Sequence, residues 1–192
     1  MGDLKDKIIA ELKNTKRMGI DELIEAMEDG GFFEAPCSGQ HHLAEPEGLM
    51  KHSWNVLEYA RKLNEAWGRI IPDDSLVLVC LLHDLGKMGD HGKPNYVENI
   101  LKNGKQSEQK PYVTNPDLVY IDHEIRSVTI AERYIFLSEE EEQAIHFHNG
   151  LYGIFKYAIP GKETPLYLVL HFADMWCSRV VEIEDKEKEE SE

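Results

Sequence analysis

Apolar residues recur every three to five positions along most of the chain, which is the spacing of helices that bury one face. The first apolar stripe predicts a helix that ends near Met18-Gly19, and a short second helix follows over residues 20–27. The later stripes predict helices over residues 48–67, 75–86, 122–136, 138–148 and 164–181. The pattern therefore favours an all-α domain built as a helical bundle.

Residue types at two helix starts support these boundaries. Pro72-Asp73-Asp74 precedes the helix over residues 75–86 and is expected to cap it. The run SLVLVCLL in this helix has no polar face, which predicts that the helix is buried. Ser138 and Glu141 have the spacing of a capping box at the start of the helix over residues 138–148.

Three longer segments have no helical pattern. Residues 32–47 contain Pro36 and Pro46 and predict a loop long enough to line a site. Residues 89–116 contain several glycines and prolines and predict a loop with a helical turn near residues 96–101. One small hairpin is expected within residues 104–121, through Tyr112-Val113 and Val119-Tyr120, and another loop over residues 150–163.

Length and composition fit one soluble domain. The chain has 192 residues, of which 42% are hydrophobic and 30% charged. A domain of this size buries about 70% of the surface that its unfolded chain exposes, so it needs no disulfide or structural metal to fold. Residues 182–192 carry seven acidic and two basic residues, which predicts an acidic disordered tail after a single domain over residues 1–181.

The net charge limits the expected partners. Lys and Arg total 21 against 36 Asp and Glu, which gives a formal charge of -15. Such a chain attracts neither duplex nucleic acid nor anionic membranes, so a small substrate is favoured. No apolar run approaches the ~20 residues of a membrane span, and the first residues lack the apolar region of a signal peptide. The three cysteines form no CxxC pair, and we expect a cytoplasmic protein.

The distribution of histidine and aspartate carries the chemical signal. His83 and Asp84 lie side by side where the buried helix ends, and two adjacent polar side chains in such a place need partners. His52, His123 and Asp174 also lie on apolar helices. A shared divalent cation would offset the free-energy cost of burying all these polar side chains, because imidazole nitrogen and carboxylate oxygen both bind such ions.

The same residues lie in segments that resemble a known family. The segments GLMKHS, LLHDLGK and LHFAD contain, in this order, His52, the His83-Asp84 pair and Asp174. This order resembles that of the HD-domain superfamily of metal-dependent phosphohydrolases, whose fold is a helical bundle. The likeness runs over residues 32–179 and includes FFEAPCSGQHHLAEPEGLMKHSWNV. It implies that these four residues are metal ligands.

Two further histidines resemble ligands of a second ion. His123 and His148 match positions at which binuclear HD subfamilies bind another metal, and the resemblance then implies that Asp84 bridges both ions. These subfamilies include cyclic-dinucleotide phosphodiesterases and HD-type 3′-to-5′ exoribonucleases. The cyclic-dinucleotide enzymes have adjacent histidines at the later position, whereas here His146 and His148 are separated by one residue. On a helix these two point about 200° apart, and we favour His148 as the ligand.

The other histidines and Lys87 have less specific expectations. The family's lysine at the position of Lys87 faces the phosphate, although the helix dipole alone also favours a lysine at a helix C-terminus. In the long loop, His42 or alternatively His41 could contact the substrate. His171 lies three residues before Asp174 and either orients that carboxylate or is an ordinary core histidine.

Several other features predict no chemistry. His91 is expected to be a solvated loop residue. Trp54, Trp67 and Trp176 lie on apolar stripes, which favours core positions over base stacking. The sequence contains neither GxGxxG nor GxxxxGK[ST], so no phosphate-binding loop is predicted.

Together these features predict an enzyme that hydrolyses a phosphoester of a nucleotide or related small phosphate. Metal-activated hydroxide would be the nucleophile, with Asp84 and Lys87 as catalytic residues. One or two ions of Mn, Fe, Co, Ni, Zn or Mg fit the expected donors. Two alternatives remain, a non-catalytic metal- or nucleotide-binding sensor and an HD-type phosphodiesterase or exoribonuclease. The kind of ester and the oligomeric state stay open.

Overall fold

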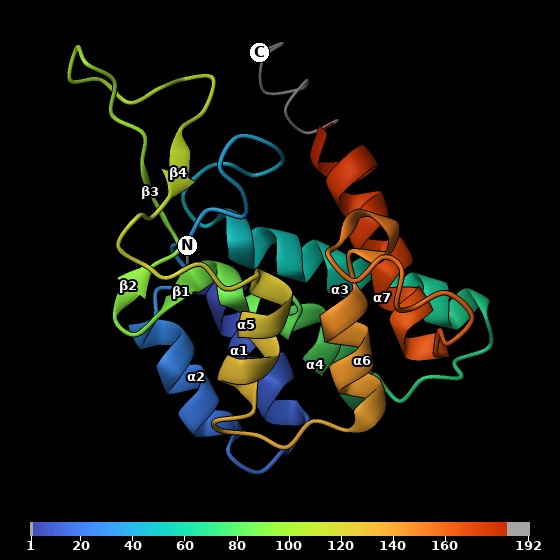
Figure 1. Ribbon diagram of the computed structural model, residues 1–192. Coiled ribbons are helices and arrows are strands. Elements are labelled where there is room, and N and C mark those ends of the chain that lie inside the picture. The colour runs from blue at the N-terminus through green and yellow to red at the C-terminus, as the bar shows by residue number, and fades with distance from the viewer. Residues whose placement is uncertain (1, 184–192) are drawn as a thin grey trace.

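The computed structural model describes residues 2–183, and helices form most of it (Figure 1). The α-helices are α1 (Gly2–Asn14), α2 (Ile20–Asp29), α3 (Gly48–Ala66), α4 (Asp73–Leu82), α5 (His123–Ala131), α6 (Glu139–Phe147) and α7 (Pro165–Trp176). Two short 3₁₀ helices are η1 (Leu85–Met88) and η2 (Gly150–Tyr152), and a π-helical turn, η3 (Cys177–Val181), continues α7. The prediction of an all-α domain with a small β insertion is confirmed. None of the described helices combines the length and apolar character needed to cross a membrane.

Helix α4 lies at the centre of the bundle and is buried from Leu76 to Leu82, as its apolar sequence predicts. It contacts α1, α3, α6 and α7. The expected cap is wrong, because Pro72 holds the N-cap position without a side-chain bond and Asp73 is already helical. The carboxylate of Asp73 accepts hydrogen bonds from Arg61 on α3 instead. Because α4 is central, the residues that follow its last turn lie in the middle of the domain.

The start of α6 has the predicted capping box. Ser138 Oγ accepts a hydrogen bond from Glu141 N at 3.3 Å, and Ser138 N donates to Glu141 Oε2 at 2.8 Å. Glu141 is buried and also accepts from Arg17 and from Ser75. These contacts join α6 to the turn after α1 and to the first turn of α4.

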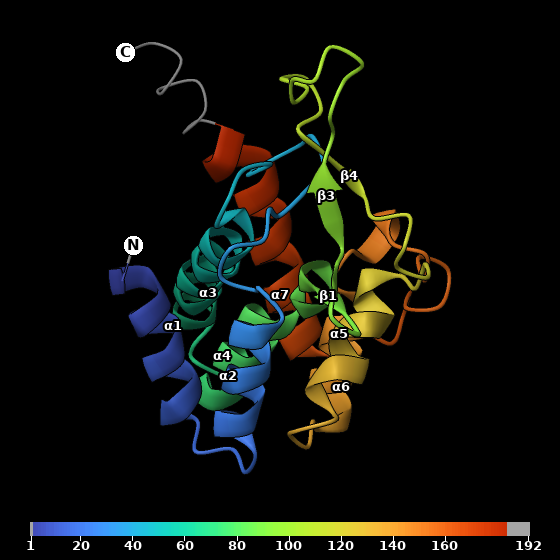
Figure 2. The ribbon, with the colours of Figure 1, turned by 90° about the vertical axis from the view of Figure 1, so that its left-hand side faces the viewer.

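The β structure differs from the prediction. Strand β1 (Gly89–Asp90) pairs with β2 (Lys93–Pro94), and β3 (Tyr96–Glu98) pairs antiparallel with β4 (Tyr112–Thr114). The predicted helical turn at residues 96–101 is therefore wrong, and so is the predicted pairing of Tyr112-Val113 with Val119-Tyr120. The Asn115 side chain binds the backbone of Pro94 and Asp117 and turns the chain away after β4. The β3–β4 hairpin stands out from the helical body in both views (Figures 1 and 2).

Two of the three tryptophans are not core residues. Trp54 packs partly buried against the core, whereas Trp67 and Trp176 are 47% and 51% exposed. These two line an apolar groove of about 710 Å³ between α3 and α7, together with Leu63 and Phe172. The apolar stripes of α3 and α7 are wider than the contact between these helices, which leaves their edges exposed.

The predicted acidic tail begins too early. Glu182 follows the π-helical turn η3 and is only 2% exposed. Its carboxylate contacts α3, as described below. The rest of that predicted tail, residues 184–192, lies outside the described residues.

Candidate metal centre

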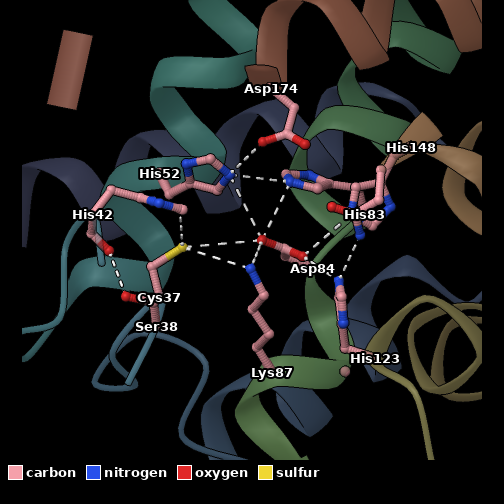
Figure 3. Close-up of polar contacts among 12 residues, drawn as sticks. Cys37, Ser38, His42, His52, His83, Asp84, Lys87, His123, His148 and Asp174 are labelled. Atoms are coloured by element: carbon pink, nitrogen blue, oxygen red, sulfur yellow. Dashed lines mark hydrogen bonds and ion pairs between the residues drawn. The ribbon is translucent and has the colours of Figure 1, made fainter. Parts of the chain in front are cut away.

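The six side chains expected to bind metal converge on one point in the domain (Figure 3). They come from five helices or helix ends: His52 on α3, His83 and Asp84 after α4, His123 at the start of α5, His148 after α6, and Asp174 on α7. Groups of three of these residues each offer ligand atoms that lie within 4.8 Å of one another. The helical bundle thus brings together residues that are up to 122 positions apart in the chain.

A glycine allows α5 to approach the end of α4 closely. A Cβ atom at Gly86 would lie 2.5 Å from the carbonyl oxygen of His123, so a side chain there would push α5 away. Gly86 N also donates a hydrogen bond to Ser127 Oγ on α5 at 2.8 Å. The glycine in the segment LLHDLGK therefore positions His123 beside Asp84.

One oxygen of Asp84 faces the first group of side chains. Asp84 Oδ2 lies 3.6 Å from His52 Nε2 and 3.4 Å from His83 Nε2. The two imidazole nitrogens are 3.3 Å apart, and Asp174 Oδ1 lies 3.2 Å from His52 Nε2. Lys87 Nζ also contacts Asp84 Oδ2, at 2.6 Å. Two imidazole nitrogens and one ammonium group therefore surround this oxygen, and Asp174 contacts one of the two imidazoles.

The other oxygen of Asp84 faces a separate group. Asp84 Oδ1 lies 3.4 Å from His123 Nε2 and 3.5 Å from His148 Nε2. It is buried and accepts no hydrogen bond from the described residues. The side-chain amide nitrogen of Asn149 lies 3.2 Å from both imidazole nitrogens. A buried carboxylate oxygen without a donor, facing two imidazole nitrogens, is a suitable environment for a cation.

The Nδ1 atoms of the histidines have acceptors that fix the ring tautomers. His83 Nδ1 donates to Cys80 O and His148 Nδ1 donates to Ile145 O, both at 2.8 Å. His52 Nδ1 lies 2.9 Å from Glu182 Oε1. A carbonyl or an ionised carboxylate oxygen can only accept, so each of these Nδ1 atoms carries a proton and Nε2 is the nitrogen that is left to bind a metal. This is the orientation that metal coordination through Nε2 requires.

Burial and the surrounding charges shift the pKa values of these groups in different directions. Burial alone would lower the pKa of His52 and of His148, but the negatively charged groups around each ring outweigh it and raise both pKa values. Burial lowers the pKa of His83, and it lowers the pKa of His123 to about 3, so these rings are neutral near pH 7. Burial alone would raise the pKa of Asp84, but the Lys87 ammonium outweighs it and holds the pKa well below its usual range. Metal binding would displace a proton from a protonated ring such as that of His52, and the neutral imidazoles with the ionised Asp84 then form a donor set for Mn, Fe, Co, Ni or Zn. The residues present therefore fit one or two divalent ions.

A pocket of about 400 Å³ opens onto this cluster. Asp84, Lys87 and Asp174 line it, and so does Arg179, which provides a second cation beside Lys87. His42 also lines it, with Nε2 3.4 Å from the Cys37 thiol. Burial lowers the pKa of His42 to about 4, so this ring adds no charge to the pocket near neutral pH.

The remaining histidines have different surroundings. The ring of His146 lies 6.3 Å from that of Phe155, outside the groups of candidate ligands. His171 Nδ1 donates to the carbonyl of His148 at 2.6 Å, so through this nitrogen it holds the end of α6 and not Asp174. His41 lines the pocket beside His42. His91 is exposed in the turn between β1 and β2, as expected.

Sequence reasoning missed four residues near the centre: Cys37, Asn149, Arg179 and Glu182. Asn149 directly follows His148 and Arg179 lies on the predicted last helix, so proximity in sequence to candidate ligands is the signal that could have found them. Glu182 lies in a run of charged residues, which hides it. Cys37 carries no sequence signal that separates it from an ordinary core cysteine.

Comparison with models of protein families assigns most of the chain to one family. A model of the HD domain family matches residues 49–174, a segment that contains all six candidate ligands. Comparisons with curated proteins and with solved structures gave no match.

Proposed function

Because the chain belongs to the HD-domain family, we propose that it is a metal-dependent phosphohydrolase that acts on a nucleotide or a related small phosphate ester. The observation that carries the proposal is the position of Asp84, whose two oxygens face two separate pairs of imidazole nitrogens. A carboxylate that only capped a helix or balanced Lys87 would not require this arrangement.

Two sets of residues would hold the ions. His52, His83 and Asp174 would hold the first ion together with Asp84, and His123 and His148 would hold the second, also with Asp84. Divalent cations supply two things to phosphoester hydrolysis, activation of water near neutral pH and neutralisation of charge on the phosphate. We propose Mn, Fe, Co, Ni, Zn or Mg as the ion.

Lys87 and His42 contact the substrate in this proposal. The Lys87 side chain is mostly buried and lines the pocket, and although burial alone would lower its pKa, the adjacent Asp84 raises that pKa, so the ammonium stays protonated. Its charge opposes the negative charge that develops on the phosphate oxygens in the transition state. His42 is neutral, so its ring can donate or accept a hydrogen bond with the substrate or leaving group without adding charge.

The dimensions of the pocket and the charge of the chain support a small substrate. A pocket of about 400 Å³ is of the size that encloses small-molecule ligands. A chain with a net charge of -15 repels a long polyanion away from the few cations of the pocket. We therefore propose small nucleotides as the substrate class, ahead of long RNA or DNA.

The test compares the wild-type protein with Asp84→Asn, with Asp117→Asn as the control because Asp117 is an exposed carboxylate outside the cluster. Each protein is loaded with Mn²⁺ and assayed for phosphate release or product formation from mononucleotides, cyclic dinucleotides and an aryl phosphate. We expect turnover in the wild type and the control, and loss of both bound metal and turnover in Asp84→Asn with unchanged helical content. Metal-loaded wild type that turns over none of these compounds would favour a binding sensor instead. Full activity of Asp84→Asn would refute the role of Asp84.

A further inference from the structure

The histidines of the centre obtain the acceptor for Nδ1 in two different ways. His83 and His148 each follow the last turn of a helix and bind the carbonyl three residues earlier. Carbonyls in the last turn of a helix have no helical N–H partner, so they are free to accept. These two rings are oriented by their own helices.

His52 has no such carbonyl available. It is the fifth residue of α3, which continues to Ala66. The carbonyls of the preceding turn therefore accept helical N–H groups from residues four positions later. An acceptor for His52 Nδ1 has to come from another element.

Glu182 provides this acceptor. Its two oxygens lie 2.9 and 3.2 Å from His52 Nδ1, and Asn55 Nδ2 donates to Glu182 Oε1 at 3.2 Å. The side chains of His52 and Glu182 are each 1% exposed. The Glu182 carboxylate is thus held between His52 Nδ1 and the Asn55 amide, away from water.

The π-helical turn explains how Glu182 reaches His52. In a regular α-helix, eight residues at 100° each would rotate Glu182 about 80° away from the face that carries Asp174. The five residues of η3 (Cys177–Val181) are π-helical. A π-helix advances only about 82° per residue, which brings Glu182 to within about 10° of the Asp174 face. Asp174 then contacts His52 Nε2 while Glu182 contacts Nδ1 of the same ring.

We propose that Glu182 is a positioning residue of the metal centre, which holds His52 with its proton on Nδ1 and its Nε2 lone pair toward the ion. The inference rests on the proposed metal-dependent function. Carboxylates that bind the outer nitrogen of a ligating histidine fix the ring orientation and raise its basicity, and their loss weakens metal binding about 10- to 100-fold. A buried ion pair with only a structural role would affect stability and leave the tautomer and the metal affinity unchanged.

The experiment measures Co²⁺ affinity by visible absorption in the full chain, without substrate. We expect Glu182→Ala to weaken binding about 10- to 100-fold relative to wild type. Glu182→Gln retains a carbonyl that can accept from Nδ1 and should lose less affinity. Asn55→Ala is the control, because it removes the other hydrogen bond of Glu182 and leaves the bond to His52; we expect a change of less than about 3-fold.

A second readout does not depend on metal or on turnover. The ¹⁵N chemical shifts of the His52 ring in the metal-free protein, recorded at a pH above the raised pKa of this ring so that the ring is neutral, report which nitrogen carries the proton. We expect the Nδ1–H form in the wild type and a mixture of forms in Glu182→Ala, whose fold is checked by near-ultraviolet circular dichroism. If the wild-type protein binds Co²⁺ but neither the Co²⁺ affinity nor the His52 tautomer changes in Glu182→Ala and Glu182→Gln, the inference about Glu182 is overturned and the proposed function is not. Wild-type protein that binds no Co²⁺ overturns the proposed function, and an unchanged tautomer in the variants then overturns the inference as well.

Discussion

Glu141 links α6, the first turn of α4 and the turn after α1 through one buried carboxylate, so its replacement should destabilise the whole domain. The Arg17 guanidinium donates to its two oxygens at 3.0 and 2.8 Å, and Ser75 Oγ and Ser138 N donate at 2.8 Å each. The Glu141 side chain is 1% exposed and that of Arg17 is 21% exposed. Glu141→Gln keeps the shape of the side chain but replaces one acceptor oxygen with an N–H₂ group that faces donors.

The expected loss can be estimated from these contacts. Breaking a buried ion pair costs about 3–5 kcal/mol, and partial exposure of Arg17 reduces this, so we expect about 2–4 kcal/mol for Glu141→Gln at pH 7. For a domain of this size, that corresponds to a fall in Tm of about 4–16 °C. Glu140→Gln removes the same charge from the same first helical turn at an exposed position and should change stability by less than about 0.5 kcal/mol.

The loss should also depend on pH in a defined direction. Burial alone would raise the pKa of Glu141, but the hydrogen bonds from Arg17, Ser138 and Ser75 outweigh it and lower the pKa below the ordinary 4.5. A group whose pKa is lower in the folded state stabilises the fold fully above its unfolded pKa and loses this effect as the pH falls through the folded value. Urea unfolding of both proteins should therefore give a constant difference from pH 6 to 8 that shrinks below about pH 4.5. A difference under 0.5 kcal/mol at pH 7, or one that does not shrink in acid, would refute this reasoning.

Three further outcomes follow from the candidate centre. With excess Mn²⁺, elemental analysis should approach two ions per chain in the wild type and one in His123→Ala or His148→Ala; one ion in all three proteins would contradict a second site. Lys87→Ala should lower kcat about 10²- to 10³-fold and leave the metal content unchanged, and equal kcat values would exclude the lysine from charge stabilisation. Removal of the metal by a chelator should lower Tm at pH 7, because an ion that binds only the folded state stabilises it, and an unchanged Tm would argue against a central site.

Helical periodicity predicts the elements of this fold better than their ends. The apolar run of α4 predicts a buried central helix, which the structure confirms. The first helix is expected to end near Met18-Gly19 but ends at Asn14. Lys16 adopts a positive φ of 53°, and Thr15 Oγ1 donates to Leu12 O and accepts from Arg17 N, so the backbone turns before the apolar pattern stops. Backbone conformation at a single residue is not contained in a periodic pattern.

Contacts between distant segments are what the sequence does not predict. The local sequence predicts a helical turn at residues 96–101 and not strand β3, because the conformation of β3 is decided by pairing with β4, which begins 14 residues after β3 ends. Glu182 belongs by composition to a solvated acidic run, but one contact with His52, 130 positions earlier, buries it. Five of the six candidate ligands can be predicted because polar residues on apolar helices need partners wherever the fold brings them. The sixth, His148, is indicated only by the resemblance to binuclear members of the HD-domain superfamily.

The span of the candidate centre along the chain has a consequence for how the protein folds. The contact between His52 and Glu182 joins positions 130 residues apart, whereas most of the bundle is held by helices that are closer in sequence. During synthesis the early helices can dock before Asp174 and Glu182 have left the ribosome. A complete ion site then exists only after the last helix has packed against α3. Interactions that form after the folding transition state slow unfolding and leave the folding rate nearly unchanged. A bound ion would accordingly slow the unfolding of the completed domain and take no part in the nucleation of folding.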